Sequence, residues 1–396
     1  MTEQDKLLTR DFLVLNFIIF LTFCNIAVFF QLHGYLLHSL HVSQEQAGFL
    51  IGVFALTALI LRPFISPFLL PGNACKWIFI GSLGVIVSLL FYRLGQGFTG
   101  MAVVRIVHGL FYVVMATAVM ARIVECIPPH RSAEAFGIIS VITLLPYAVL
   151  PPVINPLIAR FGGFLRVLDI TALMMLPILP LLALISPGRE GKTSEKNRLT
   201  LTELKENLKN RQVVRILMIS LFVFIAFTPV FYFIKDFAKS VGIENAGWFF
   251  TISTLLEILV RLAGGRYMDR GDKPKILLVS LLLLVAGYLL LAHTRSHAFF
   301  FFIAVLFGLG WGIALPLLNG MVFDFSPPRL RSLNANLGLE MFQGGFFLGP
   351  ILGGFILASW NYRILYYVCG GLILIAILFL IPFLSPSKKS LKGDTL

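Results

Sequence analysis

The sequence predicts an all-α membrane protein with twelve transmembrane helices in two six-helix, pseudo-symmetric halves. Of its 396 residues, 58% are hydrophobic and only 13% are charged, whereas soluble proteins carry roughly a quarter charged residues. Apolar runs of about 18 residues or more, the length typical of a membrane span, recur from Phe12 almost to the C-terminus. This composition excludes a soluble enzyme, a nucleic-acid-binding domain and a disordered scaffold.

Each predicted span lies between charged or turn-forming clusters and is long enough to cross roughly 30 Å of hydrocarbon. In the first half, the spans are expected at 12–36, 45–70, 76–94, 100–121, 133–159 and 164–186. In the second half, they are expected at 212–234, 245–264, 275–293, 297–323, 334–358 and 362–384. The intervening stretch 187–211 is rich in Lys, Glu, Ser and Thr. We therefore expect bundles over 1–186 and 212–396, the second with a short tail, joined by a cytoplasmic linker over 187–211.

The net charge of +13 follows from 32 Lys and Arg against 19 Asp and Glu. With twelve spans, both termini and the linker fall on one side, and that side holds a roughly threefold excess of Lys and Arg, as cytoplasmic loops do. Both termini are therefore predicted to be cytoplasmic. The polar first ten residues lead straight into a span with no small-residue cleavage site, so they are expected to precede a first helix and not to form a signal peptide.

The residues that bind metals, cofactors or nucleotides in other proteins lack the necessary spacing here. The four cysteines are far apart and form no CxxC pair, so neither a metal site nor a disulfide framework is expected. The Gly-rich run Gly308–Gly312 lies within a span and lacks the strand–turn–helix context of a phosphate loop. No Walker motif, paired Asp, His cluster or activated Ser is visible. We expect no cofactor, no metal and no enzymatic activity.

The two halves align at a constant offset of 199 residues. The aligned pairs include Arg62 with Arg261, Gly109 with Gly308, and Pro128-Pro129 with Pro327-Pro328. Arg and Pro-Pro matches at one offset, at equivalent points in the span order, indicate a duplicated six-helix unit. Parallel repeats of this kind are typical of secondary transporters whose substrate site lies between the halves near mid-membrane.

Three segments carry a resemblance to a known family. Gly265–Lys275, between spans eight and nine, has Gly, then Asp-Arg, then basic residues. Span four begins with the Arg-xxx-Gly segment Arg105–Gly109, and span eleven contains the small-residue string Gly345–Gly354. The chain thereby resembles the major facilitator superfamily over nearly its whole length, and especially its bacterial small-molecule efflux members. With the short loops, the resemblance implies a multi-pass protein of the cell inner membrane that works by alternating access.

The resemblance also implies a gate at the cytoplasmic loop, formed by Gly265, Asp269 and Arg270, that stabilises one access state. In the first half, Leu70 stands where the second half has Asp269, so the loop is not symmetric. Further gating candidates are Arg62, near the cytoplasmic end of span two, and Gly349-Pro350 in span eleven.

Ionisable groups inside spans are the candidates for proton coupling, because burying a charge in a membrane is costly. Glu257 and Arg261 are four residues apart, share a helix face and can pair. Glu257 is therefore a candidate proton carrier, or alternatively half of a structural ion pair. Glu340 in span eleven is a candidate second proton site, or alternatively the partner of a basic group on another helix.

Four residues are candidates to line the substrate cavity. Arg105 suits an anionic group, or alternatively anchors a helix end. His108, on the same face, titrates in the physiological range, or alternatively is a packed residue. Asn25 in span one and Gln343 in span eleven complete the set. Span one also carries Gln31 and His33, for which interhelical hydrogen bonds are an equal explanation.

The leading prediction is a secondary active transporter that moves a small organic solute by proton-coupled export. Export is favoured by the resemblance to efflux members, although the glycine string of drug–proton antiporters belongs to span five, which here carries Pro146, Pro151 and Pro152 instead. Proton-coupled uptake of a small metabolite is the alternative, and a non-transporting membrane sensor is a third. The expected partners are a small-molecule substrate, protons and membrane lipid, with no nucleic acid, and the chain is expected to act as a monomer.

Overall fold

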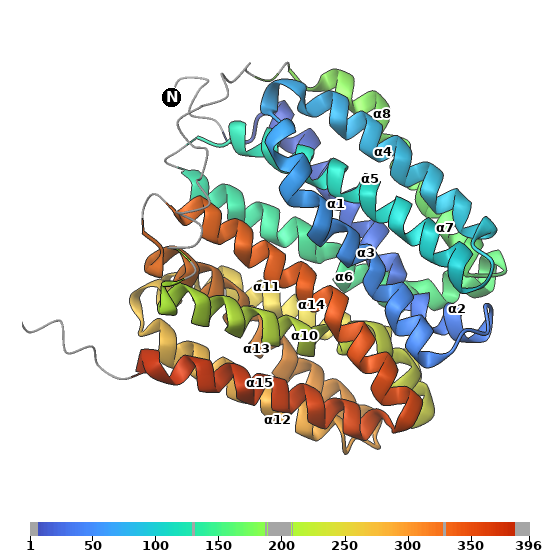
Figure 1. Cartoon of the computed structure of the whole chain (residues 1–396), viewed down its shortest axis with the longest axis vertical. Coiled ribbons are helices and arrows are strands. Elements are labelled where there is room, and N and C mark those ends of the chain that lie inside the picture. Colours follow the sequence, from blue (N-terminus) through green and yellow to red (C-terminus); the bar gives the residue numbers. More distant parts are fainter. Residues whose placement is uncertain are drawn as a thin grey trace, which may run out of the picture.

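The structure is a computed structural model that describes residues 7–128, 131–186, 188, 207, 209–327 and 330–384. Within this part of the chain, twelve helices are long and apolar enough to cross a membrane. The prediction of twelve spans is therefore confirmed. Figure 1 shows the helices of the first half, in blue to green, beside those of the second half, in yellow-green to red.

Proline and 3₁₀ turns modify the helices of the first half. The elements are α1 (Arg10–Val28), η2 (Phe29–Gln31), α2 (Leu32–His38), α3 (Gln44–Ile65), α4 (Ala74–Phe91), α5 (Gly97–Glu125), α6 (Ser132–Phe161), α7 (Phe164–Met175) and α8 (Ile178–Leu181). The second span ends at Ile65, short of the predicted residue 70, and passes into a 3₁₀ turn. The sixth span breaks after Met175, because Pro177 and Pro180 have no N–H to continue the helical ladder.

The helices of the second half are unbroken. They are α10 (Arg211–Ser240), α11 (Gly247–Arg270), α12 (Lys273–Leu291), α13 (His297–Phe325), α14 (Arg331–Ser359) and α15 (Tyr362–Leu384). Side chains of Asn210, Asp272 and Ser296 accept hydrogen bonds from backbone N–H groups in the first turns of α10, α12 and α13. Of the predicted linker 187–211, the structure describes only 188, 207 and 209–211, and α10 begins at Arg211.

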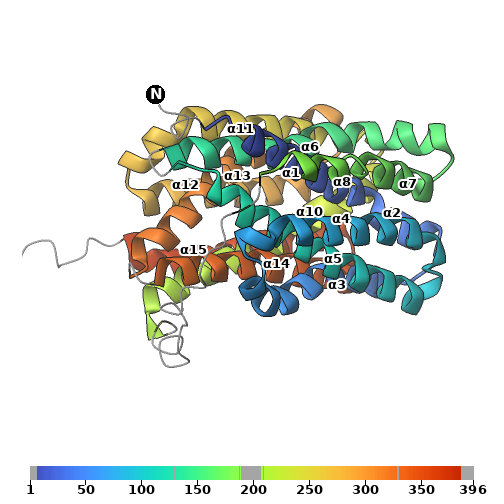
Figure 2. The ribbon, with the colours of Figure 1, turned by 90° about the horizontal axis from the view of Figure 1, so that it is seen from above.

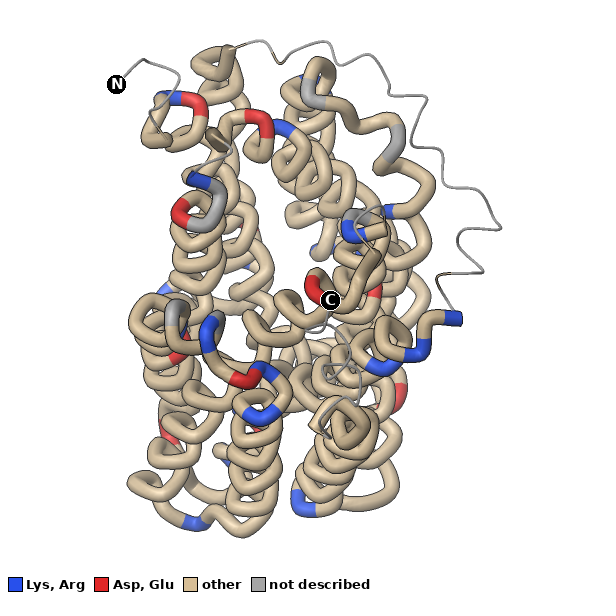
Figure 3. Tube along the Cα trace, turned by 90° about the vertical axis from the view of Figure 1, so that its left-hand side faces the viewer, with Lys and Arg blue, Asp and Glu red and all other residues tan. Residues whose placement is uncertain are grey.

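The first turn of α1 and the last turn of α15 lie at the same end of the bundle (Figures 1 and 2). We call this the terminal end and the opposite one the far end. Figure 3 looks onto the terminal end and shows Lys and Arg at many of the helix ends there.

The two halves meet where α3 packs on α14 and where α6 packs on α11. Both contacts are closest in their far-end parts. A Cβ atom on Gly48 of α3 would overlap the carbonyl oxygen of Pro350, and one on Gly247 of α11 would overlap the carbonyl of Pro151. The Thr251 hydroxyl also donates to the Ala148 carbonyl oxygen at 2.6 Å. Small residues therefore let the backbones of the two halves touch at the far end.

Candidate functional site

Two adjoining cavities lie between the halves. The smaller, of about 210 Å³, lies deep in the bundle, and the larger, of about 540 Å³, lies nearer the terminal end. Phe224, Arg261, Leu315 and Phe342 line both. The larger cavity is bordered by the terminal-end parts of α6 and α11, whereas the far-end parts of the same helices are in tight contact. The protein is therefore closed at the far end, with its central space displaced toward the terminal end.

An ion pair at the junction of the cavities joins Glu257 to Arg261. The spacing of four residues on α11 brings the two side chains together as the sequence predicts, and the Arg261 guanidinium donates to the Glu257 carboxylate. The same guanidinium donates to the Ser140 hydroxyl of α6 at 2.5 Å. One arginine therefore connects a carboxylate of its own half to the other half of the protein, across the space between them.

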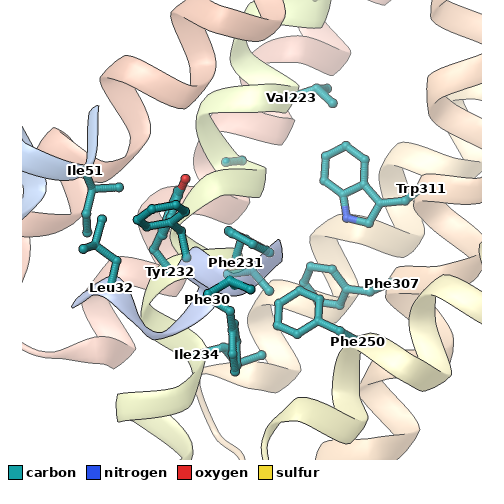
Figure 4. Packing of buried hydrophobic residues seen from close by; sticks show 14 of the residues in the cluster. Phe30, Leu32, Ile51, Val223, Phe231, Tyr232, Ile234, Phe250, Phe307 and Trp311 are labelled. Atoms are coloured by element: carbon teal, nitrogen blue, oxygen red, sulfur yellow. The ribbon is translucent and has the colours of Figure 1, made fainter. Parts of the chain in front are cut away.

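Aromatic rings form most of the smaller cavity's wall. Figure 4 shows Phe231, Phe250, Phe307 and Trp311 of this wall, together with the neighbouring Phe30. The rings meet edge-on or tilted, with centroid distances of 5.5 Å between Phe231 and Phe250 and 5.2 Å between Phe30 and Phe250. Such arrangements are favourable for aromatic pairs and give the cavity a largely apolar surface. The aromatic content of the sequence did not indicate which rings would face a cavity.

The Arg105, His108 and Asn25 side chains lie together, but away from both cavities. Arg105 is 2% exposed and donates to the carbonyl oxygens of Leu50 and Ile51 at 3.0 and 2.8 Å. The Tyr92 hydroxyl lies 3.2 Å from the Arg105 guanidinium and 3.0 Å from His108 Nδ1.

Asn25 joins the same group of buried side chains. Its Nδ2 atom lies 3.2 Å from Nε2 of His108. The Arg105 guanidinium also lies over the rings of Phe29 and Phe54. The helix face that carries the predicted cavity residues therefore points into the interior of the first half, where it forms a buried hydrogen-bond network.

Glu340 and Gln343 lie on α14, and neither lines one of the two cavities. Gln343 is 6% exposed. Glu340 is partly buried, and its Oε2 atom has no hydrogen-bond partner among the described residues. Arg62 of α3 acts on Glu340 electrostatically across the α3–α14 contact. Arg62 and Glu340 form no ion pair in the described structure, so a basic partner for Glu340 on another helix stays a prediction.

Small residues on α14 face two different neighbours. A Cβ atom on Gly349 would overlap the Thr228 side chain of α10, and the Pro350 carbonyl abuts Gly48 of α3. Gly349 and Pro350 therefore lie where α14 packs tightly against both helices, and α3 belongs to the opposite half.

The predicted gate lies at the terminal end of α11. Gly265 lines the larger cavity, Arg270 is exposed, and the side chain of Asp269 lies outside the described part of the structure. Lys273 pairs with Asp324 at 2.7 Å. A hydrogen bond from the Lys275 side chain holds the pKa of Asp272 below its usual range. Described ion pairs therefore connect this turn to the end of α13 and to the first turn of α12.

A polar contact at the far end was not predicted as a site. His33 Nδ1 of α2 lies 2.5 Å from Asp236 Oδ2 of α10, and His33 Nε2 lies 3.0 Å from Gln44 Oε1. Beside it, the Lys235 ammonium donates to the Gln31 side chain. We call His33, Asp236, Gln31 and Lys235 the far-end latch, because each of the two pairs joins one half to the other.

The sequence signal for the latch was the adjacent pair of charges after the seventh span. The predicted seventh span ends at residue 234 with its apolar run and so leaves out Lys235, whereas α10 continues to Ser240. In the part of the chain that the structure covers, no three His, Cys, Asp or Glu side chains are grouped so as to hold a metal ion.

Comparison with known proteins agrees with this architecture. The chain is 23% identical to the staphylopine export protein of Staphylococcus aureus over 364 residues, which are 88% of this chain and 89% of that protein. It is 24% identical to the quinolone resistance protein NorA of the same organism over 183 residues, 46% of this chain and 47% of NorA.

Among solved structures, a variant of the nucleoside transporter NupG superposes with a TM-score of 0.78 at 15% identity, over 94% of this chain and 100% of that one. An inward-facing bacterial homologue of the human lysosomal transporter Spinster gives 0.70 at 16% identity, over 94% of each chain. The sequence model described as Major Facilitator Superfamily matches residues 13–337 and 238–395. The chain belongs to the Major Facilitator Superfamily of transporters.

Proposed function

We propose that this transporter exports a small organic solute in exchange for protons, with Glu257 as the proton carrier. The observation that carries the proposal is the position of the Glu257–Arg261 pair, which faces the central cavity and reaches Ser140 on the opposite half. A carboxylate placed there can respond to a proton and to a solute in the same space.

In the proposed cycle, ionised Glu257 holds Arg261 in a compensated pair while solute enters from the terminal end. With solute bound, the far-end contacts separate while the terminal end closes, and the solute leaves at the far end. A proton that enters from the far end then binds Glu257 and removes the compensation, so the guanidinium charge favours the return to the arrangement of α6 and α11 that is closed at the far end. The proton leaves Glu257 at the terminal end. Such rocking of two halves about a fixed site is the general behaviour of parallel-repeat transporters.

The direction of export is supported by the relatives' names, an export protein and a resistance protein. We further propose that both termini face the cytoplasm of a bacterial inner membrane, since Lys and Arg are concentrated at the terminal end. The halves of residues 1–186 and 212–396 would then move as two bodies joined by the linker 187–211. Both sides of the cavity come from one chain, which supports function as a monomer surrounded by lipid.

Proton-coupled uptake is the second candidate function. It is favoured by the sequence of α6. The drug–proton antiporters that this chain resembles carry a glycine string in this span, whereas α6 has Pro146, Pro151 and Pro152 instead. A non-transporting sensor is the third candidate, and it predicts that no solute gives a transport signal.

The test is proton movement by the purified full chain in liposomes that contain a pH-sensitive dye, as a panel of organic solutes is added outside. Glu257→Gln is compared with Glu134→Gln, a matched control whose carboxylate pairs with Arg131 at 2.7 Å but lies half-exposed at the terminal end. We expect a solute-dependent proton signal that Glu257→Gln abolishes and Glu134→Gln preserves. Its sign separates exchange from cotransport. Normal coupling in folded Glu257→Gln would remove Glu257 from the proposal.

A further inference from the structure

Two buried hydrogen-bond donors at the smaller cavity have no acceptor. Trp311 is 3% exposed, and its Nε1 atom has no hydrogen-bond partner in the described structure. The same is true of Arg261 Nε, although the terminal nitrogens of this guanidinium bind Glu257 and Ser140. Both residues line the cavity. An unpaired buried donor is costly. A solute that supplies a hydrogen-bond acceptor therefore binds here with a more favourable free energy than a solute that supplies a donor.

The charge of the smaller cavity is balanced. Among its described lining residues, the only carboxylate is Glu257 and the only guanidinium or ammonium group is that of Arg261, and the two compensate each other. A solute with a net charge would enter this apolar space without a free counter-ion, and an uncompensated charge in such surroundings is strongly disfavoured. The cavity is therefore suited to an uncharged solute.

The shape and wall of the cavity indicate the rest of the solute. An apolar cavity of about 150 Å³ holds a benzene molecule, so the 210 Å³ found here accommodates one ring with a small substituent. The Phe227 ring meets Trp311 edge-on at 4.7 Å, and Phe342 and Phe346 lie 4.4 Å apart on the same wall. Aromatic faces of this kind favour a flat ring over a branched aliphatic group.

We propose that the smaller cavity selects uncharged aromatic solutes that carry a carbonyl-type hydrogen-bond acceptor. The acceptor takes hydrogen bonds from Trp311 Nε1 and Arg261 Nε while the ring lies among the phenylalanines, and larger solutes extend into the 540 Å³ cavity. The inference rests on the proposed function, in that this cavity is the transport site.

The test is equilibrium binding of four one-ring probes to the detergent-purified full chain by calorimetry. Acetophenone carries the acceptor, ethylbenzene lacks it, benzoate is anionic and benzylamine is cationic. We expect acetophenone to bind at least about 5- to 10-fold more tightly than ethylbenzene, the size of one of the two proposed hydrogen bonds, and more tightly than either ion. Trp311→Phe keeps a ring but removes the donor, and should reduce this preference severalfold. Trp248→Phe, at a half-exposed tryptophan near the start of α11, should leave it unchanged.

Glu257→Gln gives a second readout that does not depend on Trp311. Without the carboxylate, the Arg261 charge lacks its partner. The affinity for benzoate, relative to the affinity for acetophenone, should therefore rise at least tenfold. The inference is overturned if acetophenone and ethylbenzene bind equally, if Trp311→Phe leaves the preference undiminished, or if an ion binds best to the unmodified protein. Since binding is measured without a gradient, acceptor selectivity without a proton signal would refute only the proposed coupling. A proton signal from solutes without acceptor selectivity would refute only this inference.

Discussion

Breaking the far-end latch should open the far end of the protein. Asp236→Asn keeps the size of the side chain and one neutral hydrogen bond to His33, but removes the carboxylate. Hydrogen bonds to charged groups contribute about 1.5–3 kcal/mol and neutral ones about 0.5–1.5 kcal/mol, so the substitution should cost about 1–1.5 kcal/mol. Because this pair joins α2 to α10, the cost falls on the state that is closed at the far end. The open fraction should therefore rise about 5- to 13-fold.

The assay uses a single cysteine at position 30, in a background without the four native cysteines. Phe30 is 1% exposed and packs against Phe231 of the other half, with centroids 6.1 Å apart. A membrane-impermeant thiol reagent reaches such a cysteine only when the halves separate, so the labelling rate reports the open fraction.

Asp169→Asn is the matched control. Asp169 pairs with Arg93 at the same end of the bundle, but both residues belong to the first half. We expect Asp236→Asn to raise the labelling rate by the factor given above and Asp169→Asn to leave it unchanged. Equal rates for Asp236→Asn and the parent, or an equal rise in the control, would refute the role of the latch in closure.

Three other substitutions test separate parts of the structure. Gly48→Ala should force α3 away from Pro350 and raise the same labelling rate, whereas Gly371→Ala, which faces open space, should not. Arg105→Ala should lower the free energy of unfolding by about 3 kcal/mol or more, through unpaired buried acceptors, in a denaturation experiment. Its solute affinity should stay near that of the parent, because Arg105 lines neither cavity. Asp269→Asn should slow turnover in the liposome assay with little change in half-saturating solute concentration, and unchanged turnover would mean that this carboxylate is only solvated.

Most of the fold could be predicted from the sequence because each span is specified locally, by an apolar run long enough to cross a membrane. The deviations are local too: Pro177 and Pro180 interrupt the sixth span, and α10 runs past its apolar segment because helical hydrogen bonds continue through Lys235 and Asp236. Periodicity alone cannot show this, since a charged residue at a span end fits both a loop and a helix.

The candidate site was predictable only where its parts lie on one helix. Glu257 and Arg261 are four residues apart, so their pairing follows from helix geometry. The Arg261–Ser140 and His33–Asp236 contacts each join segments more than a hundred residues apart. Which residues meet in these contacts depends on how the two halves pack against each other. For Arg105 and His108, the spacing correctly placed both on one face, but no local pattern indicates that this face points into the first half and away from the cavity.

The prolines of α6 have a consequence for water. Pro152 has no N–H, so the Ala148 carbonyl four residues earlier lacks its helical donor, and the Thr251 hydroxyl of the opposite half supplies one. When the far end opens, that donor leaves and the carbonyl must be hydrated, since a bare backbone acceptor at membrane depth is costly. Opening therefore requires the entry of water, and conditions of low water activity should favour the far-closed form. In the proposed cycle, each opening of the far end therefore hydrates the Ala148 carbonyl and each closing dehydrates it.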